Sequence, residues 1–533
     1  MGHHRAGSLP AASPPAPVPR RSATGAPPPP GAVGPDPRHG LIPAGLVGAV
    51  AVLTLIRLIG LQLSVTDLYA DEAQYWVWAQ SPAWGYFSKP PLVAWLIAAV
   101  QPICGSGPAC VRTPSVLIWA AIPLIVAAIG TTVGGRSVGL WAGLCALLAP
   151  GAAFSARIVS TDPSLLLFWS LALLAFLKLR AGASDRWLVV LAAGIGAGLL
   201  SKYAMAYFLG GLVIAALIDR ASRRTLRRPA VWLAIAGGQA LLGPNLLWNI
   251  YHQHVTQRHN GEYLADGGVA FALDQALTQG LEFVAAQFGL AGPVVFGALI
   301  AAAVKARKLT TDQRVLLAFS APLFIAVTGV ALVNGANGNW AAPGLIAAFV
   351  LAPLMLAGRV GRRWLAGGLA FGAVIQGGLL ILDARADRWS LPGQPYESVM
   401  GWSALSDAVA RQAGATGIST IVAERRGDVA QLTYGLRGEA LEVRAWPAPA
   451  AEGPRDYFQM TRPLTDADGG PVLAVTECSD VARFRPGWRQ VQQIATATVI
   501  AGPGAARTYS LIRLDQRIGP VERPPDCPGA WST

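Results

Sequence analysis

Charged side chains are scarce in this sequence. Of its 533 residues, only 13% are Asp, Glu, Lys or Arg, whereas 53% are hydrophobic, and the mean hydropathy is +0.44. An ordinary soluble domain carries about 25% charged residues. The shortage excludes a disordered chain, a fibrous protein and an ordinary cytosolic enzyme. It favours a polytopic membrane protein with enough chain for more than one domain.

Lysine is absent from residues 383–533, which hold 16 Arg against 17 Asp and Glu. Residues 1–382 hold 26 Lys and Arg against 12 Asp and Glu, so the net charge of +13 comes from this first part. In a membrane protein such an excess anchors the cytoplasmic loops. Because no basic patch is interleaved with exposed aromatic residues, we expect membrane lipids and no nucleic acid among the partners.

Cysteine and histidine are also few, at 5 and 6 residues, and none has the spacing of metal ligands. The sequence therefore predicts no metal site and requires no cofactor, although a divalent metal is left open. Cys104 and Cys110 could pair in an oxidising compartment, and so could Cys478 and Cys527. Cys145 falls in an apolar run and is expected to serve packing. A nucleotide-binding fingerprint is also missing.

Apolar runs of membrane-spanning length recur through the first part of the chain. Residues 1–40 are rich in Pro, Ala and Gly and predict a disordered cytoplasmic tail, followed by a transmembrane domain over residues 41–382. With the N-terminus inside, 20 of the 26 basic residues of this part fall on the cytoplasmic side, which the positive-inside rule favours. The eleven expected spans are 42–64, 113–134, 138–155, 163–180, 187–200, 203–218, 230–250, 282–303, 315–333, 341–358 and 364–382.

An odd number of spans places residues 383–533 outside. Strand-like runs at 419–423, 472–476, 495–500 and 509–514 alternate there with turn-rich and helix-compatible stretches. The expected fold class is a polytopic α-helical membrane protein, N-in and C-out, with a C-terminal periplasmic α/β domain. The expected location is a bacterial inner membrane, crossed many times.

Charge gathers at the non-cytoplasmic boundary of the predicted spans, where basic residues are disfavoured. Asp71, Glu72 and Asp162 are among the acids there. The cluster indicates a polar site at the outer interface, although any single member could be a snorkelling or ion-paired side chain. The basic residues in or near this outer half are Arg57, Lys89, Arg112, Arg157, Lys202 and Arg258.

The most informative stretch follows the first span, with DEAQYW at 71–76 and GYFSKPPL at 85–92. Of two adjacent carboxylates, one could stay ionised as a base while its neighbour makes a structural hydrogen bond. The two prolines can start a helix and place Lys89 just ahead of its N-terminus, which is a favourable position for a phosphate group.

These two motifs resemble the first outer loop of membrane-embedded glycosyltransferases of the C superfamily. The similar branch is the bacterial group around the lipid A aminoarabinose transferase and the protein O-mannosyltransferases. Three further segments resemble that branch in the same order: STDPSL at 160–165, PNLLWN at 244–249 running on to Arg258 and His259, and NWAAP at 339–343. The resemblance covers roughly residues 45–390.

The resemblance implies an inverting glycosyltransferase that moves a sugar from a polyprenyl-phosphate donor to an envelope acceptor at the periplasmic face. Asp71 would be the general base on the acceptor hydroxyl, and Asp162 the second catalytic acid, which positions the acceptor or the first loop. Lys89 would bind the donor phosphate. Ser88 stands where relatives often carry an acid, so a metal site on that acid is not indicated. The other expected substrate-binding residues are Glu72, Tyr86, Lys202, Arg258 and His259.

Other interpretations remain open at this point. Asp71 could be an interfacial cap, Asp162 an N-cap, and Tyr86 part of an aromatic belt. The acceptor could be lipid A, lipopolysaccharide, another envelope glycolipid or a secreted protein. A lipid or sugar transporter is the main alternative outside the superfamily, but the sequence lacks the matching halves that transporters often show. A sensor would leave the charged outer loops unexplained.

Overall fold

The computed structural model describes residues 1–4, 43–265, 273–449 and 453–527. It divides into two units, residues 1–39 and residues 40–533. The predicted tail falls almost entirely on residues that are not described. Everything below concerns the second unit.

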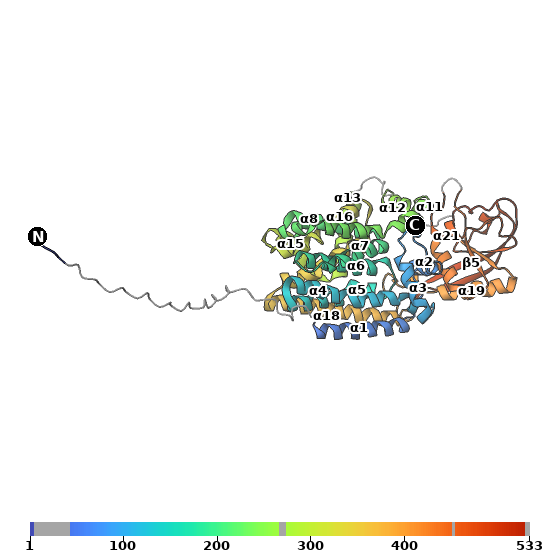
Figure 1. Cartoon of the computed structure of the whole chain (residues 1–533). Helices are drawn as coiled ribbons and strands as arrows, with labels where there is room; N and C mark the ends of the chain where they lie inside the picture. The colour runs from blue at the N-terminus through green and yellow to red at the C-terminus, as the bar shows by residue number, and fades with distance from the viewer. Residues whose placement is uncertain (5–42, 266–272, 450–452, 528–533) are drawn as a thin grey trace. The chain divides into compact units, whose positions relative to one another are not determined.

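Helices run through the first part of this unit and lie side by side (Figure 1). Each apolar run expected to span falls on one helix or on a pair of consecutive helices. The helices of this bundle are α1 (Ala44–Leu63), α4 (Pro108–Leu148), α5 (Pro150–Ser155), α6 (Thr161–Arg180), α7 (Arg186–Ser201), α8 (Tyr207–Ile218), α9 (Arg220–Leu226), α10 (Pro229–Ala240), α11 (Gly243–Tyr251), α12 (Val255–Ala265), α13 (Leu273–Ala291), α14 (Pro293–Val304), α15 (Thr311–Ala318), α16 (Ala321–Asn334), α17 (Pro343–Met355) and α18 (Gly358–Asp383).

Length and composition qualify some of these helices as membrane spans. Among the described residues six are long and apolar enough, or up to seven if the bent pair α13 and α14 counts as one span. Four further apolar helices are shorter. The expected spans 113–134 and 138–155 share the long α4, which bends at Gly135, where φ is 80°. Glycine tolerates this left-handed backbone without strain. The chain is therefore a multi-pass membrane protein.

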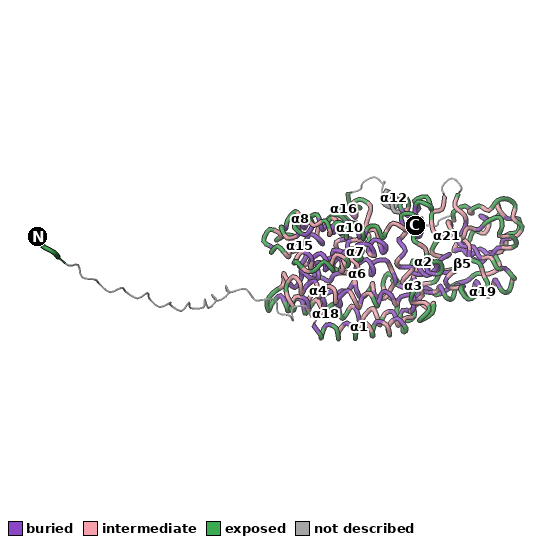
Figure 2. The backbone as a smooth tube through the Cα atoms, in the orientation of Figure 1, coloured by how far each residue is buried: buried purple, intermediate pink, exposed green. Residues whose placement is uncertain are grey.

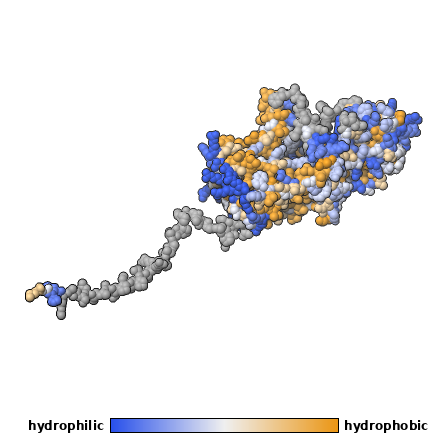
Figure 3. Space-filling model, turned by 45° about the horizontal axis from the view of Figure 1, so that its top comes forward, coloured by the Kyte–Doolittle hydropathy of each residue, from blue (hydrophilic) through white to orange (hydrophobic). Residues whose placement is uncertain are grey.

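Burial separates the central helices from the peripheral ones. Helix α6 is buried on nearly every side, whereas α1 and α18 keep long exposed faces (Figure 2). The exposed faces carry large apolar side chains such as Leu55 and Ile59 on α1 and Val374 on α18. Figure 3 shows apolar residues gathered over the helices. Apolar faces of this extent are expected where lipid rather than water surrounds a helix.

A mixed five-stranded sheet forms the C-terminal part, in the order β2-β1-β3-β5-β4. The strands are β1 (Thr420–Ala423), β2 (Glu442–Ala445), β3 (Val472–Thr476), β4 (Trp488–Ile500) and β5 (Ala506–Arg517), with α19 (Trp402–Thr416), α20 (Arg426–Gly435) and α21 (Tyr457–Thr461) among them. β1 is parallel to β2 and β3, and β5 is antiparallel to β3 and β4. The four strand-like runs are confirmed, and the short β2 was not predicted.

Two disulfides are present, Cys104–Cys110 and Cys478–Cys527, and Cys145 is buried and free. Both pairings considered from the sequence are thus confirmed. The second bond ties the end of the described chain to the residues just after β3.

The sheet domain packs on the loop segment that joins α1 to α4, which holds α2 (Ala70–Ala79) and α3 (Leu92–Cys104) (Figure 1). Asp67 accepts a hydrogen bond of 2.8 Å from the backbone N–H of Trp402. Gln431 donates to the Leu68 carbonyl at 2.6 Å, and Tyr434 donates to the Ser106 carbonyl at 2.7 Å. The sheet domain therefore holds this loop segment against the helical bundle.

Candidate active site

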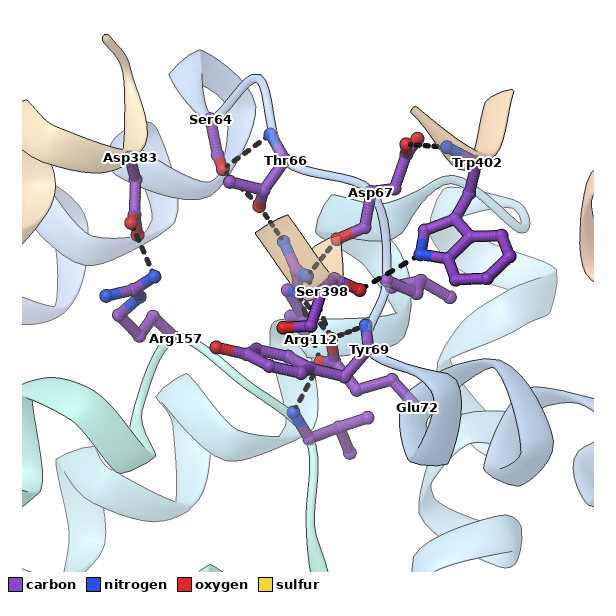
Figure 4. A network of polar contacts seen from close by, with 12 residues as sticks. Ser64, Thr66, Asp67, Tyr69, Glu72, Arg112, Arg157, Asp383, Ser398 and Trp402 are labelled. Carbon is purple, nitrogen blue, oxygen red and sulfur yellow. Dashed lines mark hydrogen bonds and ion pairs between the residues drawn. The ribbon is translucent and has the colours of Figure 1, made fainter. Parts of the chain in front are cut away.

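Glu72 lies at the centre of a buried polar network (Figure 4). Its carboxylate accepts hydrogen bonds from Arg112, with Nη2 to Oε2 at 2.8 Å and Nε to Oε1 at 3.0 Å. The backbone N–H groups of Tyr69 and Val159 donate to the same carboxylate at 2.9 and 2.8 Å. Since protein donors occupy both oxygens, Glu72 fixes the start of α2 against α4 and the segment before α6. This geometry suits a positioning residue better than a substrate contact.

Asp71, one residue earlier, is much more exposed than Glu72. Its side chain is 58% exposed, and it forms an ion pair of 2.8 Å with Nη1 of Arg426 at the start of α20. The same nitrogen of Arg426 donates to Gln74 at 3.0 Å. Asp71 is therefore the more accessible of the two carboxylates, and it lines the cavity described below.

Asp162 stands at the start of α6, where Ser160 caps the helix by accepting from the Asp162 N–H at 3.3 Å. The Asp162 carboxylate accepts from Nζ of Lys202 at 2.7 Å and from the amide of Asn339 at 2.6 Å. Three distant segments therefore meet at this acid. The expected acid and the expected lysine are brought together, and their partner Asn339 comes from the NWAAP motif.

Lys89 is partly buried and precedes the two prolines that lead into α3. Burial lowers the pKa of Lys89 and the nearby Lys202 lowers it further, whereas Asp71 and Asp162 raise it. These shifts show that the two acids and the two lysines share one electrostatic neighbourhood. Within the described chain no carboxylate lies within ion-pair distance of the Lys89 ammonium.

Tyr86 is buried and supports the loop rather than facing a ligand. Its hydroxyl donates to the Trp78 carbonyl at 3.0 Å and accepts from the Ala83 N–H at 3.1 Å, and its ring stacks on Trp78 with centroids 4.6 Å apart. Burial raises the pKa of Tyr86 to about 12. The phenol therefore stays protonated near neutral pH.

Arg258 and His259 lie on α12, which packs against the same loop. Thr256 donates to the Tyr86 carbonyl at 2.9 Å, and the His259 ring lies 5.3 Å from that of Phe87. Arg258 is exposed, and its side chain is not brought against the acids or lysines of the site. The structure therefore places His259 at the edge of the loop and leaves Arg258 outside the cluster.

A cavity of about 990 Å³ opens beside the acids. Asp71, Glu72 and Asp162 line its polar end, and the remaining wall is largely apolar. The apolar wall includes Trp119, Phe154, Leu166, Leu290, Leu345 and Phe349. Such a chamber can hold a long apolar chain while its polar end holds a charged headgroup.

The described residues contain no group of three His, Cys, Asp or Glu able to hold a metal ion. The arrangement instead combines the exposed Asp71, which pairs with Arg426, the lysine-paired Asp162, and Lys89, which has no acid partner among the described residues. An exposed carboxylate can accept a proton from a hydroxyl, and ammonium groups can stabilise a phosphate.

The sequence did not predict Arg426 as a partner of the site, because it lies 355 positions from Asp71 and no local pattern links the two residues. Arg112 stood out as a basic residue in an apolar run, which was the available sign of a buried acid. Arg157 also stood out as a basic residue in the outer half, and it too has a buried acid as its partner, since it pairs with Asp383 at 2.5 Å. Arg57 instead donates to Gln376 and to the Leu147 carbonyl.

Comparison with solved structures identifies the fold. The chain resembles ArnT from Cupriavidus metallidurans in the apo state with a TM-score of 0.57, at 16% identity, over 88% of this chain and 98% of that one. The structure of the same protein bound to undecaprenyl phosphate gives 0.56 over the same shares. The family described as dolichyl-phosphate-mannose-protein mannosyltransferase matches residues 88–248.

The matched family model, the relative described next and the shared fold together show a membrane-embedded glycosyltransferase of the C superfamily. The lipid A galacturonosyltransferase RgtD of Rhizobium johnstonii is 33% identical over 453 residues, which is 83% of this chain and 91% of that protein. The chain belongs to the family that contains this relative, and it is a glycosyltransferase.

Proposed function

We propose that the protein transfers a uronic acid from a polyprenyl-phosphate donor to lipid A or a similar envelope glycolipid, at the periplasmic face of the inner membrane. The observation that carries this proposal is that Asp71 and Asp162 line the polar end of a largely apolar cavity. Lys202 pairs with Asp162 at 2.7 Å, and Lys89 lies near enough to both acids for them to raise its pKa. The galacturonosyltransferase relative supports the sugar class and the acceptor, and the ArnT complex supports a polyprenyl-phosphate donor.

The proposed topology has eleven crossings with the N-terminus in the cytoplasm, a transmembrane domain over 41–382 and a periplasmic domain over 383–533. Basic residues support it. Arg223, Arg224, Arg227 and Arg228 lie on or just after α9, at the end of the bundle that would face the cytoplasm. The acids and lysines of the site lie by the sheet domain at the other end.

The proposed reaction inverts the anomeric carbon. Asp71 accepts the proton of the acceptor hydroxyl while the hydroxyl oxygen bonds to the anomeric carbon. The bond from that carbon to the phosphate oxygen breaks, and polyprenyl phosphate leaves with the electron pair. Lys89 and Lys202 stabilise the charge that develops on the leaving phosphate. Asp162 holds Lys202 in place at 2.7 Å, and Glu72 holds the loop that carries Asp71.

The experiment supplies purified protein with radiolabelled polyprenyl-phosphate galacturonate and lipid A acceptors. We expect transfer by the wild type and a loss of about 100-fold or more in Asp71→Asn and Lys89→Ala, since general-base and charge stabilisation each contribute about that much. Matched controls are Asp407→Asn on the exposed face of α19 and Lys305→Ala just after α14. Both controls are expected to keep wild-type rates.

Two outcomes would contradict the proposal. Undiminished turnover in Asp71→Asn would remove the assigned base. Transfer to a peptide in place of lipid A would favour a protein glycosyltransferase of the same superfamily.

A further inference from the structure

Arg507, at the start of β5, lines the same cavity as the acids. It belongs to the wall that the sheet domain contributes, together with Ser398 and Trp402. Its guanidinium lies over the Trp402 ring, 4.1 Å from the centroid, and Nη2 donates to the Met400 carbonyl. Both contacts fix the orientation of the guanidinium at the cavity wall.

The charges that line the cavity are unequally matched. Each of the three lining carboxylates has a cation: Asp71 has Arg426, Glu72 has Arg112, and Asp162 has Lys202. Arg507 is the one cation among the described lining residues, and no carboxylate of the described chain lies within 4.0 Å of it.

The N–H groups of Arg507 also differ in their hydrogen bonding. Its Nε is buried and has no hydrogen-bond partner. The acid of the sheet domain that interacts with it electrostatically, Asp428, is fully buried, and this burial raises the pKa of Asp428 to about 7. Near neutral pH that carboxyl is therefore only partly charged. Arg507 also lines a neighbouring cavity, where Glu477 pairs with Arg425 at 2.6 Å.

A buried guanidinium N–H without an acceptor is costly, because it loses its contact with water. An oxyanion in the cavity would give the guanidinium a counter-charge, which no carboxylate of the described chain supplies within 4.0 Å. A hydrogen bond from a guanidinium to a carboxylate is stronger than one to a neutral hydroxymethyl group.

We infer that Arg507 binds the carboxylate of the transferred uronosyl group and so selects an acidic sugar over the neutral hexose of the same stereochemistry. This inference rests on the proposed function. It agrees with the two negative groups of the donor. Lys89 and Lys202 would bind the phosphate, and Arg507 would bind the sugar carboxylate. A neutral sugar would leave the guanidinium unmatched.

The test compares two donors that differ only at C6, polyprenyl-phosphate galacturonate and polyprenyl-phosphate galactose, with the full-length protein in detergent. The readout is the ratio of kcat/KM for the two donors. We expect Arg507→Gln to lower this ratio by about 10- to 100-fold, the size of a charge-assisted pair. Arg507→Lys should lower it less, since it keeps the charge but not the fork.

The matched control is Arg513→Gln on the same strand, where Arg513 pairs with Asp515 at 2.9 Å and does not line the cavity. It should leave the ratio unchanged. A general loss of folding would lower kcat/KM equally for both donors. The ratio therefore distinguishes a role of Arg507 in recognising the carboxylate from a role in stabilising the cavity wall.

An unchanged ratio in Arg507→Gln, with wild type preferring the uronate, would overturn the assignment of Arg507 and leave the proposed function intact. A wild-type protein that prefers the galactose donor would overturn the proposed sugar class and the assignment with it.

Discussion

The buried pair of Glu72 and Arg112 makes a quantitative prediction about stability. Glu72→Gln leaves the Arg112 guanidinium buried without its counter-charge, and Arg112→Met leaves the carboxylate with only its backbone donors. Both side chains are almost inaccessible, at 4% and 2% exposure. Breaking one partner of such a pair costs about 3–5 kcal/mol.

The double substitution should behave differently from the two single ones. Glu72→Gln with Arg112→Met removes both charges and leaves two apolar or neutral groups of similar volume. We expect its loss of unfolding free energy to be smaller than the sum of the single losses by at least about 2 kcal/mol.

Unfolding by SDS in mixed micelles, followed by tryptophan fluorescence, measures these differences. The control is Arg228→Gln, which breaks an ion pair with Asp185 whose side chains are 37% and 65% exposed. That pair should contribute about 1 kcal/mol or less. The prediction would be wrong if each single substitution lowered the unfolding free energy no more than the control does. It would also be wrong if the two single losses simply added in the double variant.

Two further predictions concern the sheet domain. Arg426→Gln should lower kcat about 10-fold while folding is retained. The reason is that the 2.8 Å ion pair with Arg426 holds the Asp71 carboxylate in its catalytic orientation. An unchanged kcat would show that Arg426 does not orient Asp71. Burial raises the pKa of Asp428 from 3.8 to about 7, so the folded state holds that proton more tightly than the unfolded state. The stability from this group is fully present below about pH 4 and is lost, by up to about 4 kcal/mol, as the pH rises through 7. Asp428→Asn should therefore flatten the decline of the melting temperature between pH 5 and pH 8, and an identical decline in both proteins would contradict the assignment.

The sequence predicts well what depends on local pattern. Long apolar runs locate the helices, and short strand-like runs locate four of the five strands, because each signal is contained within one element. The strand β2 was missed because two of its four residues, Glu442 and Arg444, are charged, so no apolar run marks it.

Contacts between distant segments are harder to predict. The motifs identify Asp71 and Asp162, but nothing near them indicates Arg426, which lies in another domain. The adjacency of Asp71 and Glu72 suggested different roles for the two carboxylates, but it did not identify the partner that buries Glu72 and leaves Asp71 exposed. That difference depends on Arg112, which is 40 residues away and becomes a neighbour only through folding.

The most direct test of the account is the rate of uronosyl transfer to lipid A by Asp71→Asn, measured in a single turnover with the donor prebound. We expect donor binding close to wild type and a chemical step slowed by about 100-fold or more. A single-turnover rate equal to wild type would contradict it, because the exposed acid at the mouth of the cavity would then not be the base.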